Sequence, residues 1–186
     1  MISGWFDFQD VYRLSLNFYK TGKFVEVGSW LGKSSQYLAS SIKNSGTSIK
    51  LYCVDTWEGS KNEPEHAAAI EKMGGPAALY NSFLLNLSEF IRGEILVPIK
   101  KTSIEAAEDF EDNSLDFVYI DAGHTYEEVK QDLLAWLPKV RSGGLFAGHD
   151  YDIHNVNSEG LIRAVQEILT VEKLTILNKS WCYIKD

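Results

Sequence analysis

The sequence predicts an α/β fold in which a mostly parallel, doubly wound sheet is covered by helices on both faces. Strand-like and helix-like segments alternate along almost the whole chain of 186 residues. The strand-like segments are short and nearly all apolar, which is typical of strands buried on both faces. Four of them are followed by residues suited to ligand binding, at the edge where parallel sheets bind ligands: Gly28, Asp55, Asp121 and His149.

Helices are expected wherever apolar residues recur at intervals of three and four. The first such segment ends before Gly22, the second closes near Gly46, and the third ends around Pro138, because these residues do not continue a helix. The expected helices cover residues 8–18, 31–42, 126–137 and 161–169.

Strands are expected where short apolar runs are bounded by glycine or by a charged residue. Two final runs are joined across Asn178 and Lys179, a pair of residues that favours a hairpin. The expected strands are 24–27, 49–54, 95–99, 115–120 and 144–148, followed by a terminal hairpin of 174–177 and 181–184.

Residues 58–93 interrupt the alternation as a long insertion after the second strand. The segment contains Pro64, the breaker Gly74-Gly75-Pro76 and two helical patches. It is too apolar for a plain linker, so we expect a lid or a wall of the substrate pocket. An ordinary additional pair of helices is the alternative.

The composition excludes several classes of protein. With 45% hydrophobic and 24% charged residues, the chain is neither disordered nor fibrous. A net charge of -8 argues against a nucleic-acid partner, which normally requires a basic face. No apolar run is long enough for a membrane span, and the N-terminus does not resemble a signal peptide. Cys53 and Cys182 each lie in an apolar run, so we expect buried thiols and a reducing cytoplasm.

The loop after the first strand carries the most informative motif, in which Gly28 and Gly32 bracket a turn between a strand and a helix. A P-loop has four residues between its glycine and the Gly-Lys-Ser triplet, whereas here there are three. A dinucleotide fingerprint has glycine where this chain has Trp30. The pattern therefore favours a nucleoside site without a pyrophosphate.

Glu26-x-Gly28-x-x-x-Gly32-x-Ser34 resembles the first motif of class I S-adenosylmethionine methyltransferases, in the version found in catechol-type O-methyltransferases. Asp55 lies 23 residues beyond Gly32, where a carboxylate can accept both ribose hydroxyls. The resemblance implies that cofactor contacts come from these residues and their neighbours, with the indole of Trp57 offering a flat face to adenine. The implied contacts are Glu26, Gly28, Ser29, Gly32, Ser34, Asp55, Thr56 and Trp57. A tight turn at Gly28 and a helix cap at Asp55 are the structural alternatives.

Two later segments resemble the methyltransferase domain 24 family. They are Tyr119-Ile120-Asp121-Ala122-Gly123-His124-Thr125-Tyr126 and, after Asp132, Trp136 and Gly143-Gly144, the run Gly148-His149-Asp150-Tyr151. The resemblance implies that residues 1–186 form one Rossmann-like methyltransferase domain. It also implies a sheet of seven strands, the last of them antiparallel, and S-adenosylmethionine as cofactor.

The strand ends also supply candidate catalytic residues, Asp121, His149 and Asp150. A hydroxyl acceptor must lose its proton to a base or bind a divalent metal. Catechol-type relatives bind magnesium with Asp, Asp and Asn at the corresponding positions. Here the second position is His149, which suits manganese, zinc or iron better than magnesium, or which could serve as the base.

Four further residues have candidate roles. The resemblance places Asp121 and His124 beside the cofactor or substrate. It places Ser103 at the adenine end of the cofactor, with a helix N-cap as the alternative for Ser103. His154 lies on a loop beside the expected acceptor pocket, and His66 is expected at the surface.

The predicted function is O-methylation of a small-molecule hydroxyl, on a sugar or another metabolite, activated by a metal such as Mg or Mn or by a His/Asp base. One alternative is an ATP-dependent kinase or hydrolase that uses Gly32-Lys33-Ser34. A non-catalytic cofactor-binding protein and a metal-dependent oxygenase are the others. No nucleic-acid or membrane partner is expected, and either a homodimer or the insertion would complete the acceptor pocket.

Overall fold

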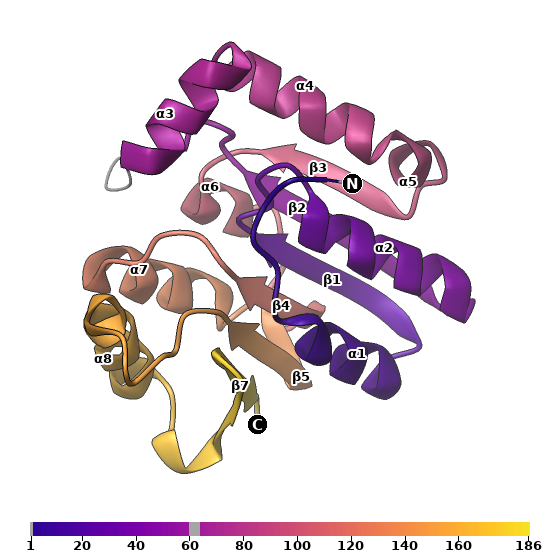
Figure 1. Cartoon of the computed structure of the whole chain (residues 1–186). Coiled ribbons are helices and arrows are strands. Elements are labelled where there is room, and N and C mark those ends of the chain that lie inside the picture. The colour runs from indigo at the N-terminus through magenta and orange to yellow at the C-terminus, as the bar shows by residue number, and fades with distance from the viewer. Residues whose placement is uncertain (1, 60–63) are drawn as a thin grey trace.

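The computed structural model describes residues 2–59 and 64–186, which form alternating helices and strands (Figure 1). The helices are α1 (Gln9–Phe18), α2 (Lys33–Ser45), α3 (Pro64–Met73), α4 (Pro76–Asn86), α5 (Ser88–Arg92), α6 (Ser103–Ala107), α7 (Tyr126–Trp136) and α8 (Glu159–Ile168), with short 3-10 turns at Val156–Ser158 and Val171–Lys173. The strands are β1 (Thr21–Val27), β2 (Ser48–Asp55), β3 (Leu96–Lys100), β4 (Leu115–Ile120), β5 (Val140–Gly148), β6 (Leu174–Leu177) and β7 (Ser180–Ile184).

The strands form one sheet of seven, in the order β3-β2-β1-β4-β5-β7-β6. Strands β1 to β5 run parallel, whereas β7 is antiparallel to both β5 and β6. The order reverses beside β1, so the ends of β1 and β4 form the crevice where such sheets bind ligands. The predicted fold class and the terminal hairpin are confirmed.

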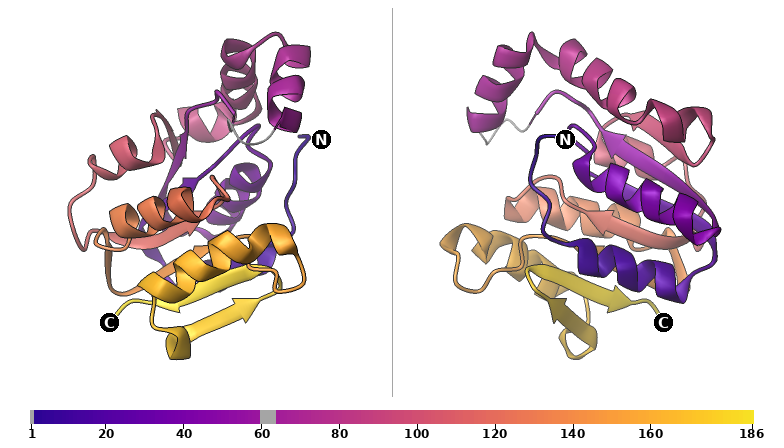
Figure 2. Two further views of the ribbon diagram at one scale, coloured as in Figure 1. Left: turned by 90° about the vertical axis from the view of Figure 1, so that its left-hand side faces the viewer. Right: turned by 45° about the vertical axis from the view of Figure 1, so that its right-hand side comes forward.

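Helices cover both faces of the sheet, as two views at different angles show (Figure 2). Along β1, Phe24 packs into a core with α1, α2, α4 and α5, while Val25 packs into a second core with α6, α7 and α8. This alternation follows from the period of two along a strand. It explains why the buried strands are apolar at nearly every position.

The insertion divides into two parts. Helices α4 and α5 bury Leu79, Phe83 and Phe90 in the first core, so they serve as the crossover between β2 and β3. Helix α3 lies beyond the carboxyl ends of the strands (Figure 1). A lid function for α3 stays a prediction, and residues 60–63 of the insertion lie outside the described residues.

Strand ends extend beyond the apolar runs that predicted them. Strand β1 begins at Thr21 and β5 at Val140, because backbone pairing continues into polar residues that periodicity does not detect. Strand β3 lies at one edge of the sheet, where it pairs with β2 among the described strands, and it contains Pro98. Among the described residues no helix has the length and apolar character needed to cross a membrane.

Candidate functional site

Glu26, near the end of β1, is fully buried and forms hydrogen bonds with the loop that follows this strand. Its carboxylate accepts hydrogen bonds from the hydroxyls of Tyr12 at 2.6 Å and Ser29 at 2.9 Å, and from that of Ser35. A buried carboxylate needs such donors. Glu26 therefore positions the loop through α1 and α2. The roles of Tyr12 and Ser35 were missed because neither residue lies at a strand end.

The two glycines of the loop are required by close packing within the chain. Gly28 has a φ of +90°, and a Cβ there would lie 1.8 Å from the backbone oxygen of Asp121. Gly32 has a φ of +85°, and its Cβ would collide with Leu87 of the segment between α4 and α5. The loop is thus pressed against the end of β4 on one side and the insertion on the other. The neighbouring Ser34 is buried in the first turn of α2.

Asp55, at the end of β2, is tied to this loop by backbone amides. Its Oδ2 accepts from Ser29 at 2.9 Å and from Trp30 at 2.8 Å, and its Oδ1 accepts from Trp57 at 2.7 Å. Burial raises the pKa of the Asp55 carboxyl, although the three amides and the nearby His66 oppose that shift. A carboxylate offers about four acceptor positions. Three of these positions already accept backbone amides, so Asp55 has one position left for a ribose hydroxyl. A second hydroxyl could bind only if one of the three amide hydrogen bonds were broken.

Trp57 faces the insertion. Its indole is 0% exposed, packs against Tyr80 and Phe83, and donates from Nε1 to the Trp30 oxygen at 2.8 Å. The expected stacking of adenine on this ring has no free face available in this arrangement, so a contact would come from the backbone. Thr56 is partly buried, and its hydroxyl accepts from the Glu58 amide at 3.2 Å.

Ser103 points toward α7. Its hydroxyl accepts from the indole N–H of Trp136 at 2.9 Å and donates to Asp132, whose pKa this bond lowers against the effect of burial. The N-cap of α6 is Thr102, which forms a capping box with Glu105, so the alternative of Ser103 as the cap is wrong. The expected adenine contact from Ser103 stays a prediction.

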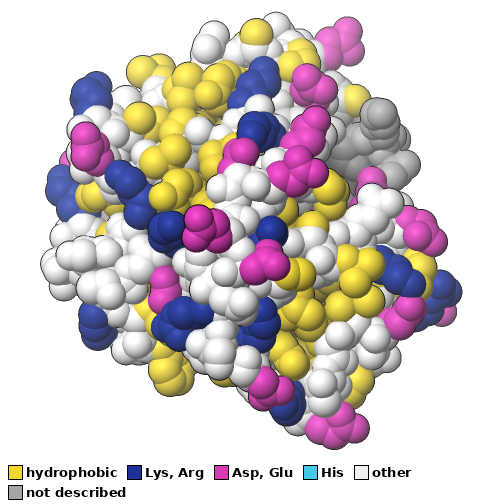
Figure 3. All heavy atoms as spheres, turned by 180° about the vertical axis from the view of Figure 1, so that it is seen from behind, with side chains coloured by type: hydrophobic (Ala, Val, Ile, Leu, Met, Phe, Trp, Pro, Cys, Tyr) yellow, Lys and Arg dark blue, Asp and Glu magenta, His cyan; other side chains and the backbone are white. Residues whose placement is uncertain are grey.

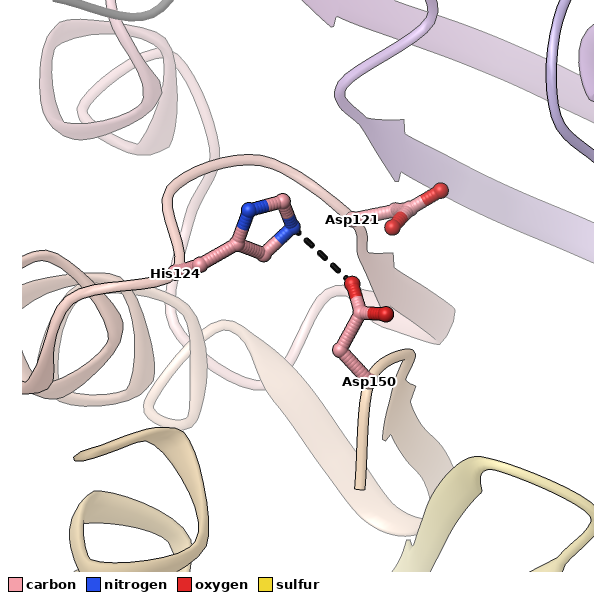
Figure 4. Close-up of side chains that lie close together, drawn as sticks. All are labelled: Asp121, His124 and Asp150. Carbon is pink, nitrogen blue, oxygen red and sulfur yellow. Dashed lines mark ion pairs between the residues drawn. The ribbon is translucent and has the colours of Figure 1, made fainter. Parts of the chain in front are cut away.

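The ends of β4 and β5 bring together the acidic and histidine residues that the sequence singled out (Figure 4). Asp121 follows β4, where its amide donates to the Val27 oxygen of β1 at 2.8 Å. From the end of β5, His149 Nδ1 lies 3.3 Å from Asp150 Oδ1 and 3.7 Å from Asp121 Oδ1. His124 Nε2 lies 2.9 Å from Asp150 Oδ2. We call these four residues the acid-histidine cluster.

The two carboxyls of the cluster, Asp121 and Asp150, differ in the direction of their pKa shifts. Burial raises the pKa of Asp121 to about 7, with Asp150 adding to the shift and His149 opposing it. Burial would also raise the pKa of Asp150, but hydrogen bonds from His124 and His149 outweigh it and hold that pKa well below its usual range. Asp121 is therefore the carboxyl that can take up a proton near neutral pH.

Carboxylates on both sides of the His149 ring favour its protonated form. Its Nε2 lies 2.8 Å from Asp7 Oδ1, so both ring nitrogens face carboxylates. Although burial acts in the opposite direction, the bond to Asp150 and the charges of Asp121 and Asp7 raise the pKa of His149. An imidazolium neither accepts a proton nor binds a metal ion. The geometry thus favours Asp121 over His149 as a base.

Three residues of the cluster could hold a metal ion. One potential ligand atom from each of Asp121, His124 and Asp150 lies within 4.8 Å of the others. The sequence had placed His149 in this set. The closely spaced ligand atoms include one from His124, while Nδ1 of His149 also lies near Asp150 and Asp121, so the place of His149 in the metal set stays a prediction. Two carboxylates and one imidazole suit manganese, zinc or iron better than magnesium.

The segment before α1 contributes residues that the sequence analysis did not single out. Asp7 contacts His149, and the ring of Phe8 lies 5.0 Å from the His149 ring. Trp5 contacts His66, which lies partly buried between Trp5 and Trp30 rather than at the open surface. Residues 2–7 have no periodic pattern and follow no strand, so no sequence signal marked them, and Phe8 was expected only as the start of a helix.

Two hollows lie near the cluster. A cavity of about 10 Å³ between Asp121, His149 and Leu161 has room for at most a single water molecule. A larger one, of about 480 Å³, lies between α8 and the loop after β5, and its lining includes His154 and Arg163. His154 therefore lines a hollow, and its role in an acceptor pocket stays a prediction.

Comparison with known proteins agrees with this geometry. A family model described as a methyltransferase domain matches residues 25–151. The uncharacterized protein y4gI of Sinorhizobium fredii is 28% identical over 131 residues, which span 70% of this chain but only 13% of that protein. Among solved structures, the O-methyltransferase NovP is 16% identical with a TM-score of 0.63, covering 95% of this chain and 78% of its own. CalS11, a TDP-rhamnose 3'-O-methyltransferase of calicheamicin biosynthesis, is 18% identical with a TM-score of 0.63, covering 95% and 76%.

The matched segment runs from β1 to the residue after the acid-histidine cluster. It contains the cluster and the loop from Gly28 to Gly32, which we call the cofactor loop because the sequence predicts cofactor contacts there. The two solved structures share the fold of the sheet and its helices. The chain therefore belongs to the methyltransferase domain family.

Proposed function

We propose that this domain methylates a hydroxyl group of a small-molecule acceptor and that Asp121 takes the hydroxyl proton. The observation that carries the proposal is the position of Asp121. Its backbone touches Gly28 of the cofactor loop, while its side chain lies in the acid-histidine cluster with a pKa of about 7. A base at this position would lie close to the bound methyl donor and could also take the proton of the acceptor hydroxyl.

The cofactor would be held by the loop between β1 and α2 and by Asp55. The remaining acceptor position on Asp55 suits a ribose hydroxyl, and the two glycines fix the shape of the loop by packing against the end of β4 and the insertion. When bound, S-adenosylmethionine supplies a methyl group activated by its attachment to a positively charged sulfur. The net charge of -8 is compatible with a cationic cofactor.

Proton transfer balances the reaction. With the cofactor bound, the acceptor oxygen would take the methyl group and the sulfur would leave with its bonding electrons, while a carboxylate oxygen of Asp121 would take the hydroxyl proton. His149, held between Asp7 and Asp150, stays protonated and stabilises the negative charge of Asp121 before the transfer. Burial of Asp121 makes it a stronger base than an exposed carboxylate.

The donor set of Asp121, His124 and Asp150 also fits a divalent cation, which we propose as a second mode of activation. A cation bound there would lower the pKa of the acceptor hydroxyl. The two modes differ in their response to chelation. Loss of turnover in EDTA, restored by Mn²⁺, would support the cation, and turnover unchanged by EDTA would support Asp121 as the base.

We infer a small molecule rather than a nucleic acid as acceptor from the surface charge. Lys and Arg side chains alternate with Asp and Glu over the face opposite that of Figure 1, without a continuous basic area on that face (Figure 3). A nucleic-acid partner would require such an area. We also propose the cytoplasm as the compartment, since Cys53 and Cys182 are both free and buried.

The test is calorimetric titration with S-adenosylhomocysteine, with ATP and NAD as parallel ligands. We expect micromolar binding of S-adenosylhomocysteine alone, weakened in Asp55→Asn and unchanged in Glu58→Gln, whose side chain is exposed. Asp121→Asn should bind the cofactor yet lose turnover of any acceptor that the wild type methylates. Tight binding of ATP would favour the kinase or hydrolase alternative.

A further inference from the structure

Trp5 is an exposed aromatic residue on an anchored segment. Its side chain is 70% exposed. On one side of it, the Gly4 oxygen accepts from Lys33 Nζ at 2.6 Å. On the other side, the ring of Phe6 packs against Tyr37 at a centroid distance of 5.1 Å. The backbone on both sides is thus fixed, so the indole is held out into solvent in a defined place.

Two further rings define how the indole is held. The His66 ring lies 5.5 Å from the Trp5 ring with an interplanar angle of 39°, and 4.9 Å from the Trp30 ring with an angle of 31°. These three rings come from the N-terminal segment, α3 and the cofactor loop. We call them the aromatic trio. Contact on one side limits rotation of the indole and leaves the rest of its surface free.

The aromatic trio is linked by contacts and by the chain to both halves of the site. At one end, the Trp30 amide donates to Asp55, and His66 is close enough to affect the pKa of that carboxyl. At the other end, Trp5 is two residues from Asp7, which contacts His149. Two residues span at most about 7 Å. Trp5 is thus linked through its neighbours to both the Asp55 carboxylate and the acid-histidine cluster.

We propose that Trp5 is an acceptor-binding residue, on which an uncharged, hydroxylated ring stacks by one face. This inference rests on the proposed function and names the acceptor class for it. Stacking follows from the exposed flat surface of the indole. An anionic acceptor is disfavoured by the exposed carboxylate of Asp7, two residues from Trp5 in the chain, and by the net charge of -8.

The shared chemistry, a ring with an apolar face and hydroxyl groups, occurs in both sugars and phenols. The experiment therefore has two arms, a set of methyl pyranosides and a set of catechols. Each is tested with an anionic counterpart, a sugar phosphate or a dihydroxybenzoate. Binding to the whole chain, saturated with S-adenosylhomocysteine, is measured by saturation-transfer NMR at millimolar concentrations of the compound.

We expect neutral rings of one arm to bind and their anionic counterparts to bind at least tenfold more weakly. Trp5→Ala should weaken binding of the neutral ring at least tenfold, and Trp5→Phe should restore it to within about threefold. Phe18→Ala is the matched control, because Phe18 is also an exposed aromatic residue, at 65%, but lies at the far end of α1. Its affinity should equal that of the wild type.

The outcomes separate this inference from the proposed function. If the wild type does not bind S-adenosylhomocysteine, the proposed function fails. If it does, the inference alone is overturned by any of three results: no neutral ring binds, the anionic counterpart binds equally well, or folded Trp5→Ala binds as tightly as wild type. Circular dichroism establishes that the variants are folded.

Discussion

Asp132 provides a direct test of the electrostatics, since it is a carboxyl buried in α7 at 5% exposure. Burial raises its pKa from 3.8 to about 6, in spite of its hydrogen bond with Ser103. The folded state thus binds a proton more tightly than the unfolded state. The contribution of protonated Asp132 to the free energy of unfolding is fully present below pH 3.8 and is lost as the pH rises through 6.

The shift sets the size of the effect. A difference of one pKa unit corresponds to 1.36 kcal/mol, so ionised Asp132 lowers the free energy of unfolding by about 3 kcal/mol above pH 6. Asp132→Asn keeps the shape of the side chain but does not titrate. The variant should therefore gain stability over the wild type as the pH rises, and most of the about 3 kcal/mol should develop between pH 4 and pH 8.

The assay is urea unfolding of both proteins at several pH values across that range. The readout is how the difference in free energy changes with pH, because a constant offset from the altered hydrogen bond with Ser103 then cancels. Glu172→Gln, which changes an exposed carboxylate, should show a nearly constant difference. A difference between Asp132→Asn and wild type that is equal at pH 4 and pH 8 would refute the reasoning.

Three further predictions concern the site. Gly28→Ala should destabilise the fold by about 3 kcal/mol or more in urea unfolding, because its Cβ meets the Asp121 backbone, whereas Gly46→Ala, with open space around it, should lose only about 1 kcal/mol. Equal losses would contradict the close approach. Turnover should rise with pH and level off above about 7, since Asp121 must be ionised to act, and a profile that is flat from pH 5 to 9 would exclude it as the base. His124→Ala should weaken Mn²⁺ binding about tenfold or more, as measured by electron paramagnetic resonance, while His154→Ala should not weaken it. Equal Mn²⁺ affinities of the two variants would remove His124 from the metal site.

The sequence predicted the sheet and the positions of the site because both depend on local patterns. Apolar runs end at Asp55 and Asp121, and the run before His149 ends at Gly148. Since the ends of parallel strands share one edge, the grouping of these residues followed from topology.

Side-chain direction could not be predicted in the same way. Asp150 has a φ of +59°, a turn geometry that apolar periodicity does not encode. Next to it, His149 contacts Asp7 through Nε2, and His124 contacts Asp150. Trp57 is covered by Tyr80 and Phe83, contacts between segments distant in sequence. The N-terminal residues were missed because they belong to no periodic element.

Pro98 affects how copies of this domain can associate. Strand β3 forms one edge of the sheet, and proline has no N–H to donate to an added strand. The other edge is β6, where Thr175 and Ile176 are both exposed. Edge-to-edge pairing is therefore blocked on one side only. A sheet that continues from one copy into a second would join them two-fold symmetrically through β6, which limits such assembly to a pair and prevents a growing fibre.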